Sequence, residues 1–333
     1  MSKLKKIIML AGILSVCFAS CTNKNKPEEY QKTEEEENES VVYMTNEISA
    51  ESLVKMFEVL NVKPEGRVGV KISTGDGKGV HALSPNLIKD LVQKLNANII
   101  ECNTAYEGTR HKTDLHWETI KKHGYDTIAK VDIMDEEGEI KLPIKDGKHL
   151  KYDIVGSHID NYDFIVNLAH FKGHQMAGFG GVLKNQSIGF ASTNGKAYIH
   201  SAGTWSQMAD LWEKHVATQD DFLESMAEAA KAVADKFQGK IVYIAVMNNM
   251  SIDCDCNGNP AQPLIKDFGI LASTDPVALD KACLDIIFNM ESSDYNNTKP
   301  LKDRINQQNG KHIVEYAEKI GLGTTKYILQ AVN

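Results

Sequence analysis

The feature that most constrains the fold is a repeated alternation of short apolar runs with amphipathic segments. Apolar runs typical of buried strands cover residues 68–72, 98–102, 164–168, 240–247 and 269–272. Apolar residues at helical spacing cover residues 86–95, 114–123, 206–237, 276–288 and 310–320. Because a strand–helix–strand order joins parallel strands, this alternation predicts an α/β fold with a largely parallel sheet and helices on both faces.

Local signals refine this prediction. Residues 131–134 and 139–144 alternate around a turn-forming DEEG sequence, so we expect a hairpin and therefore a mixed sheet. Asp114 is the expected N-cap of the 114–123 helix, and Gly124 ends it. The long segment 206–237 is expected to form two helices that break near residues 218–221.

The first twenty residues resemble a bacterial lipoprotein signal peptide. A basic start is followed by the apolar run Ile7–Val16, which is too short to span a bilayer, and then by Phe18-Ala19-Ser20-Cys21. This order predicts cleavage before Cys21 and lipidation of its thiol, so membrane lipid is the expected partner at that residue. An ordinary secretory signal and an uncleaved anchor are the alternatives.

The next segment, residues 21–40, is expected to be an acidic disordered tether. Residues 22–40 contain three lysines, seven glutamates and almost no apolar side chains. Residues 41–333 would then form one α/β domain held at the cell envelope, outside the cytoplasm. The formal net charge of −8 gives no support for nucleic-acid binding, which requires a basic face. An anion site in this chain must therefore come from local geometry.

The densest cluster of chemically active side chains follows the apolar run at 164–168. His170, Lys172 and His174 alternate, so on an extended chain they would point the same way toward an anion or a metal. On a helix the two histidines would share one face and could bind a metal. The alternative is a polar loop whose histidines bond only to the backbone. Ligand sites in α/β proteins favour this position, at the carboxyl end of a strand.

A glycine-rich turn then leads to Lys184 and Asn185. Gly178, Gly180 and Gly181 let the backbone approach a ligand, and a helix that begins here would direct free N–H groups at an anion. Tight packing of that helix on the sheet is the alternative. Downstream, Asn194-Gly195 predicts a turn in an exposed loop that carries Lys196 and His200.

Two further loops offer ligands. Arg110 follows the 98–102 strand and could hold a carboxylate or phosphate. Asp253, Cys254 and Cys256 follow the 240–247 strand, and the cysteine pair could ligate a metal, form a local disulfide or lie inert. The remaining thiols, Cys102 and Cys283, are expected to be buried and free.

Two stretches carry a family resemblance. The residues KGHQMAGFGGVLKNQSIGFAS, with GK and a histidine after them, and DCDCNGNPAQPLIKDFGILASTDPVALDKACLDII resemble the family called domain of unknown function 362, most closely its branch of uncharacterised iron-sulfur-centre proteins. Typical members of that branch carry a ferredoxin-like insert with cluster-binding cysteines. The matching stretch here, a helical insert at about 206–239, contains no cysteine, so a ferredoxin-type cluster motif is absent. The resemblance marks recurrent family positions at Lys172, His174, Lys184, Asn185, Lys196, His200, Asp253, Cys254, Asp255 and Asp275.

Together these patterns predict a polar His/Lys/Cys pocket at the carboxyl edge of the sheet. The hypothesis is a metal-binding or oxidoreductase-like site, with a divalent metal as cofactor, that acts on a small anionic ligand; the residues leave open whether the protein is an enzyme. The expected catalytic residues are Lys172, His174, Lys184 and His200, the ligand-binding residues Arg110, Asn185 and Lys196, and the metal ligands His170, His174, Asp253, Cys254 and Cys256. The alternatives are a non-catalytic module that binds a small anion and a protein-interaction module that uses the apolar face of the 206–237 helices.

Overall fold

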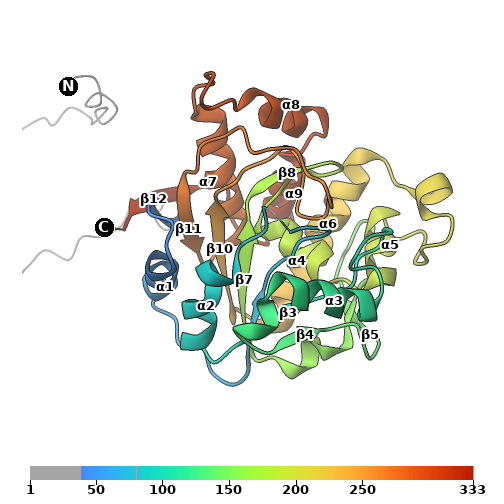
Figure 1. Ribbon diagram of the computed structural model, residues 1–333. Coiled ribbons are helices and arrows are strands. Elements are labelled where there is room, and N and C mark those ends of the chain that lie inside the picture. Colours follow the sequence, from blue (N-terminus) through green and yellow to red (C-terminus); the bar gives the residue numbers. More distant parts are fainter. Residues whose placement is uncertain (1–38, 80, 333) are drawn as a thin grey trace, which may run out of the picture. The chain divides into compact units, whose positions relative to one another are not determined.

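The structure is a computed structural model that describes residues 39–79 and 81–332 (Figure 1). The expected signal peptide, Cys21 and all but the last two residues of the expected tether lie outside this part of the chain. The main sheet has eight strands in the order β12-β1-β11-β10-β7-β2-β3-β4. In that order the strands are Tyr327–Ala331, Ser40–Thr45, Gly269–Ser273, Ile241–Met247, Phe164–His170, Val68–Lys71, Asn98–Glu101 and Val131–Ile133.

The strand directions confirm the predicted fold class. β10, β7, β2, β3 and β4 pair in parallel, and β1 pairs in parallel with β12. β11 runs antiparallel to both of its neighbours, so the sheet is mixed but largely parallel. Two small antiparallel pairs lie outside it, formed by β5 (Glu139–Pro143) with β6 (Tyr152–Gly156) and by β8 (Lys172–His174) with β9 (Gly178–Gly180).

Helices cover both faces of the sheet, because successive residues of the buried strands point to opposite sides. On β7, Val166 packs into one core with the helices α1 and α2, and Ile165 packs into the other core with α4, α6, α7 and α9. The helices are α1 Ala50–Glu58, α2 Pro85–Lys94, α3 Thr113–His123, α4 Val182–Phe190, α5 Thr193–His200, α6 Gln219–Phe237, α7 Pro276–Asn289, α8 Lys299–Gln307 and α9 His312–Lys319.

Two local predictions are wrong. The 131–134 and 139–144 segments do not form a hairpin, since β4 extends the parallel sheet beside β3 while β5 pairs with β6. All three residues of β4 are buried, and burial in the main sheet outweighs the local turn signal. The N-cap of α3 is Lys112 rather than Asp114, whose carboxylate accepts from the adjacent Leu115 N–H inside the first turn. Gly124 does end α3, in a left-handed conformation.

The segment around Asn194-Gly195 also differs from expectation. It lies inside α5, where the Ser192 side chain caps the helix by accepting from the Gly195 N–H. A Cβ at Gly195 would lie 1.9 Å from the Ile154 carbonyl oxygen, so the glycine permits close packing of α5 on β6. Lys196 and His200 are therefore buried on a helix rather than exposed on a loop.

The long helical segment is interrupted at residues 216–218, just before the predicted break, and only a short π-helix forms in its first half. A π-helix at Leu211–His215 precedes α6, and the Thr218 side chain caps α6. Phe222, Leu223 and Met226 are buried in the core against α4 and α9, so this part of the apolar face proposed for a partner packs within its own domain, whereas Trp212 stays exposed. In the described ranges, no helix combines the length and apolar character needed to cross a membrane.

Candidate functional site

One large cavity lies at the carboxyl ends of the parallel strands. Its volume is about 980 Å³, and its walls come from the loops after β2, β3, β7 and β10 and from α4 and α5. β3 and β4 extend the sheet on one side of β2, while β7 and β10 lie on the other side. The cavity thus occupies the point where the strand order reverses, which is where open α/β sheets bind ligands.

Three lysines line this cavity: Lys71 from β2, Lys184 from α4 and Lys196 from α5. The Lys71 ammonium donates to the Ile72 carbonyl and to Asn185 Oδ1 at 3.2 Å, and the Lys196 ammonium donates to the Ala191 carbonyl. Within the described residues, none of the three forms an ion pair, and Lys184 has no hydrogen bond from its side chain. The cavity therefore gathers positive charge that the protein leaves without a carboxylate partner.

This arrangement lowers the pKa of two of these lysines, Lys71 and Lys184. Burial lowers the pKa of Lys71 to about 8, even though Glu101 partly offsets it. Burial, with the positive charges of Lys172, Lys71 and Arg110, lowers the pKa of Lys184 to about 7. Both shifts mean that the cavity disfavours its own ammonium groups, and an anionic ligand would reverse that effect.

The two cavity histidines present different atoms. His174 Nδ1 accepts from the backbone N–H groups of Met176 and Ala177, so the neutral ring carries its hydrogen on Nε2. His200 Nδ1 donates to the Lys196 carbonyl at 2.7 Å, which leaves a lone pair on Nε2. Burial lowers the pKa of both rings, that of His200 to about 4. His174 is thus a hydrogen-bond donor and His200 an acceptor, base or ligand.

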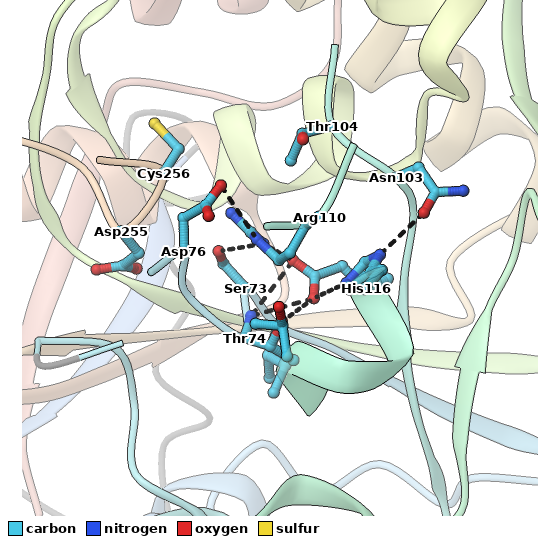
Figure 2. A network of polar contacts seen from close by, with 12 residues as sticks. Ser73, Thr74, Asp76, Asn103, Thr104, Arg110, His116, Asp255 and Cys256 are labelled. Carbon is cyan, nitrogen blue, oxygen red and sulfur yellow. Dashed lines mark hydrogen bonds and ion pairs between the residues drawn. The ribbon is translucent and has the colours of Figure 1, made fainter. Parts of the chain in front are cut away.

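Arg110 belongs to a buried polar network in the cavity wall, and Figure 2 shows this network. Its guanidinium pairs with Glu101, contacts Ser73 Oγ at 3.3 Å and lies 3.9 Å from Asp76. Glu101 also accepts from Thr74 and bonds to His116, and although burial alone would raise its pKa, Arg110 and His116 hold that pKa well below its usual range. Because Glu101 already neutralises Arg110, the guanidinium is poorly placed to be the main anion ligand expected of it.

Asn185 has a supporting role in this arrangement. Its amide nitrogen donates to the Lys71 carbonyl and to Asn167, while its oxygen accepts from the Lys71 ammonium. Gly189, one turn further along α4, has no side chain where the Lys71 ammonium lies, since a Cβ there would come within 2.8 Å of it. Both residues therefore position Lys71 at the cavity wall.

His170 and Lys172 lie beside the cavity but are held by Asp255. His170 donates from Nδ1 to Asp255 at 2.9 Å and from Nε2 to the Asn248 carbonyl at 2.6 Å. Lys172 forms an ion pair with the other oxygen of Asp255 at 2.8 Å. With both ring nitrogens donating, His170 has no lone pair for the metal expected there. His170 and Lys172 thus share Asp255 as a partner, whereas only His174 of the three alternating residues lines the cavity.

The N-terminus of α4 is also occupied by a protein side chain. Asp280, fully buried on α7, accepts from the N–H groups of Val182 and Leu183 at 2.8 and 2.9 Å. A Cβ at Gly181 would lie 2.1 Å from this carboxylate, so the glycine makes room for Asp280. The expected anion site at this helix end is therefore filled by Asp280, and Lys184 meets the cavity from the side of the helix.

The loop after β10 brings sulfur to the cavity. Cys254 and Cys256 form a disulfide, which decides among the three alternatives left open by their spacing, and both line the cavity. Ligand atoms of His174, Cys254 and Cys256 lie within 4.8 Å of one another. Asp253 lines the cavity too, with one oxygen accepting from the Ala261 N–H. Cys102 and Cys283 are buried free thiols, as predicted.

Sequence reasoning missed several cavity residues. Lys71 and Glu101 are the last residues of apolar strands, and neither they nor Ile188 and Trp212 were expected to line the site. A charged residue that closes an otherwise apolar strand is the signal that identifies Lys71 and Glu101, because such a side chain lies at the ligand-binding edge.

Residues 68–285 match the family described as Domain of unknown function (DUF362). The chain belongs to this family. The DUF362 region includes the loops after β2, β3, β7 and β10 that form the cavity wall. It begins with β2, the strand that carries Lys71. A comparison with curated proteins found no match.

Two solved structures are similar to this DUF362 chain. The lactate racemase apoprotein from Thermoanaerobacterium thermosaccharolyticum has 13% sequence identity and a TM-score of 0.43, covering 79% of this chain and 60% of that one. A crystal structure of a Thermotoga maritima protein has 15% identity and a TM-score of 0.40, covering 66% of this chain and 54% of that one. The chain thus spans less than two thirds of either protein, and at these scores the likeness supports no assignment of function.

Proposed function

We propose that this protein binds a small organic anion in the cavity at the carboxyl edge of its sheet. The observation that carries the proposal is the group of three lysines, Lys71, Lys184 and Lys196, which line one cavity without an ion-pair partner among the described residues. Buried charges are normally paired, since an unpaired one costs several kcal/mol. A ligand carboxylate or phosphate would supply the missing negative charge.

The size and lining of the cavity favour an organic ligand over an inorganic ion. A volume of about 980 Å³ is at the upper end of the range for small-molecule sites. The wall also has apolar surface, from Ala105, Met176, Ile188 and Trp212. Trp212, in the π-helix before α6, is 43% exposed. The expected ligand therefore combines an anionic group with a carbon framework.

The site also has groups that can move protons. Lys184, with a pKa of about 7, exchanges a proton readily at neutral pH, and His200 presents a free Nε2 lone pair. We therefore propose acid–base chemistry on the bound anion, with Lys184 and His200 as the catalytic residues and His174 as a hydrogen-bond donor to the ligand. Lys172 supports the site through Asp255 instead of contacting the ligand.

Isothermal titration calorimetry with a panel of phosphates and carboxylates tests the proposal. A binding anion is expected to lose at least about tenfold in affinity in Lys184→Met, because a charged hydrogen bond contributes about 1.5–3 kcal/mol. Lys214→Met is the matched control, since Lys214 is exposed, pairs with Asp210 and does not line the cavity. If no anion binds, or if both variants lose affinity equally, the proposal is wrong.

A metal site is the second candidate, favoured by the close approach of His174, Cys254 and Cys256. Cysteine binds zinc as the thiolate, so ligation by Cys254 and Cys256 needs their disulfide reduced. His174 would also have to move its hydrogen from Nε2 to Nδ1, so that Nε2 could bind the metal. Nδ1 would then no longer accept from the N–H groups of Met176 and Ala177. Elemental analysis of reduced, anaerobically purified protein, with His174→Ala beside it, tests this candidate. Stoichiometric metal that is lost in the variant would support it, and a metal-free reduced protein would remove it.

We further propose that the protein is a lipoprotein tethered through Cys21 at the cell envelope. The support is the basic, apolar and small-residue order before Cys21 and the acidic stretch after it. Mass spectrometry of the mature N-terminus, with Cys21→Ser as control, tests this. An unmodified Cys21 or an uncleaved N-terminus would refute it.

A further inference from the structure

We propose that Lys184 is a nucleophile that forms a Schiff base with the carbonyl carbon of an oxo acid held in the cavity. This inference rests on the proposed anion-binding function and names the class of ligand and the covalent step. It comes from the contacts of the three cavity lysines, which are not equivalent.

Lys184 alone among these lysines has an unengaged amine. The ammonium groups of Lys71 and Lys196 each donate to a backbone carbonyl, which fixes both in the cavity wall. The Lys184 side chain has no hydrogen bond or ion pair among the described residues, although it lines the same cavity on the first turn of α4. Because Asp280 accepts from the Val182 and Leu183 N–H groups, these backbone donors of α4 do not compete with Lys184 for a ligand.

The surroundings of Lys184 also favour the neutral amine that attacks carbonyl groups. Lys172, Lys71 and Arg110 place positive charge around it, and burial adds to their effect on its pKa. A lysine beside other cations in a desolvated site is the usual arrangement for Schiff-base chemistry. Lys71 and Lys196 line the same cavity and can donate hydrogen bonds to a carboxylate on the same ligand, so the site fits a compound with both a carbonyl and an anionic group.

The step balances without an oxidant. The Lys184 nitrogen lone pair forms a bond to the carbonyl carbon, and the carbonyl π electrons move to oxygen, which takes up a proton. The nitrogen loses a proton, for which His200 Nε2 is an available acceptor. The resulting hydroxyl group then leaves as water after taking a second proton, and the nitrogen lone pair forms the C=N bond. The product at this stage is a protonated imine, which returns one proton to solvent, so the net products are one imine and one water.

Reductive trapping tests the inference. The unmodified protein is incubated with pyruvate or 2-oxoglutarate and sodium cyanoborohydride. It is then digested and analysed by mass spectrometry. Hydride addition to the imine would leave a stable secondary amine on the peptide that contains Lys184. Lys184→Arg keeps the positive charge but cannot form the imine, and Lys214→Arg is the matched control for exposed lysines.

Separate binding measurements distinguish the two proposals. We expect stoichiometric labelling of Lys184 in the unmodified protein and in Lys214→Arg, and its loss in Lys184→Arg, while calorimetry still detects binding of the oxo acid to that variant. Oxo acids that bind without labelling Lys184, or label lysines indiscriminately, would overturn the Schiff base and leave the binding function standing. Absence of binding together with absence of label would overturn both.

Discussion

The lowered pKa of Lys71 predicts that the unliganded protein gains stability as the pH rises from about 8 to about 10.5. Lys71 is 1% exposed, and burial lowers its pKa from the ordinary 10.5 to about 8. Between these two values the unfolded state binds more protons than the folded state, so the free energy of unfolding increases with pH. Below pH 8 both states are protonated and the full penalty for burying the charge remains.

The expected size of this effect follows from the shift. A difference of about 2.5 pKa units corresponds to about 3 kcal/mol over that pH window. The Lys71→Met variant lacks this titrating group. Between pH 8 and 10.5, the free energy of unfolding of the variant should therefore rise by about 3 kcal/mol less than that of the unmodified protein. The loss of the bond to Asn185 shifts the variant's stability by an amount that does not depend on pH.

Urea denaturation followed by tryptophan fluorescence at several pH values between 7 and 10.5 measures this difference. Lys94→Met is the control, because Lys94 is exposed and pairs with Glu58 at the surface. A saturating anion should also flatten the pH dependence of the unmodified protein, since a bound negative charge favours the ammonium form. Parallel stability curves for the unmodified protein and Lys71→Met would refute the reasoning.

Three other changes test separate parts of the structure. Gly189→Ala should leave the fold intact but lower anion affinity several-fold by calorimetry, because its Cβ would displace the Lys71 ammonium; unchanged affinity would contradict this. Asp280→Ala should lower the free energy of unfolding by about 2 kcal/mol, since two N–H groups lose their cap, and Asp280→Asn should recover part of it. A thiol reductant should expose Cys254 and Cys256 to iodoacetamide while Cys102 and Cys283 stay unlabelled, as peptide mass spectrometry would show.

The sequence predicted the layers and the location of the site because both depend on strong, regular signals. β10 is apolar throughout and is followed directly by Asn248, and β7 is apolar except for Asn167 until it ends in His170. The parallel sheet then brings these loops to one edge, as expected for His174, Lys184, His200 and Cys254.

What could not be predicted depends on contacts between distant residues. Asp280 lies 98 positions from Val182, and nothing in the local sequence shows that it caps α4. Asp255 likewise holds His170 and Lys172, which lie 85 and 83 positions before it, and so keeps both out of the cavity lining. β1 and β12, at opposite ends of the described chain, form a parallel edge that neither segment reveals alone.

The position of Asp255 between the two cysteines has a mechanical consequence. The Asp255 carboxylate binds His170 and Lys172 at the end of β7, and the Asp255 carbonyl accepts from the Asp76 N–H. Breaking the buried ion pair would leave an uncompensated charge, so this attachment of the loop is costly to open. Although burial alone would raise the pKa of Asp255, His170 and Lys172 keep it far below its usual range, so the attachment persists in mild acid. Opening the sulfur bridge would therefore change the chemistry of the wall without releasing the wall itself.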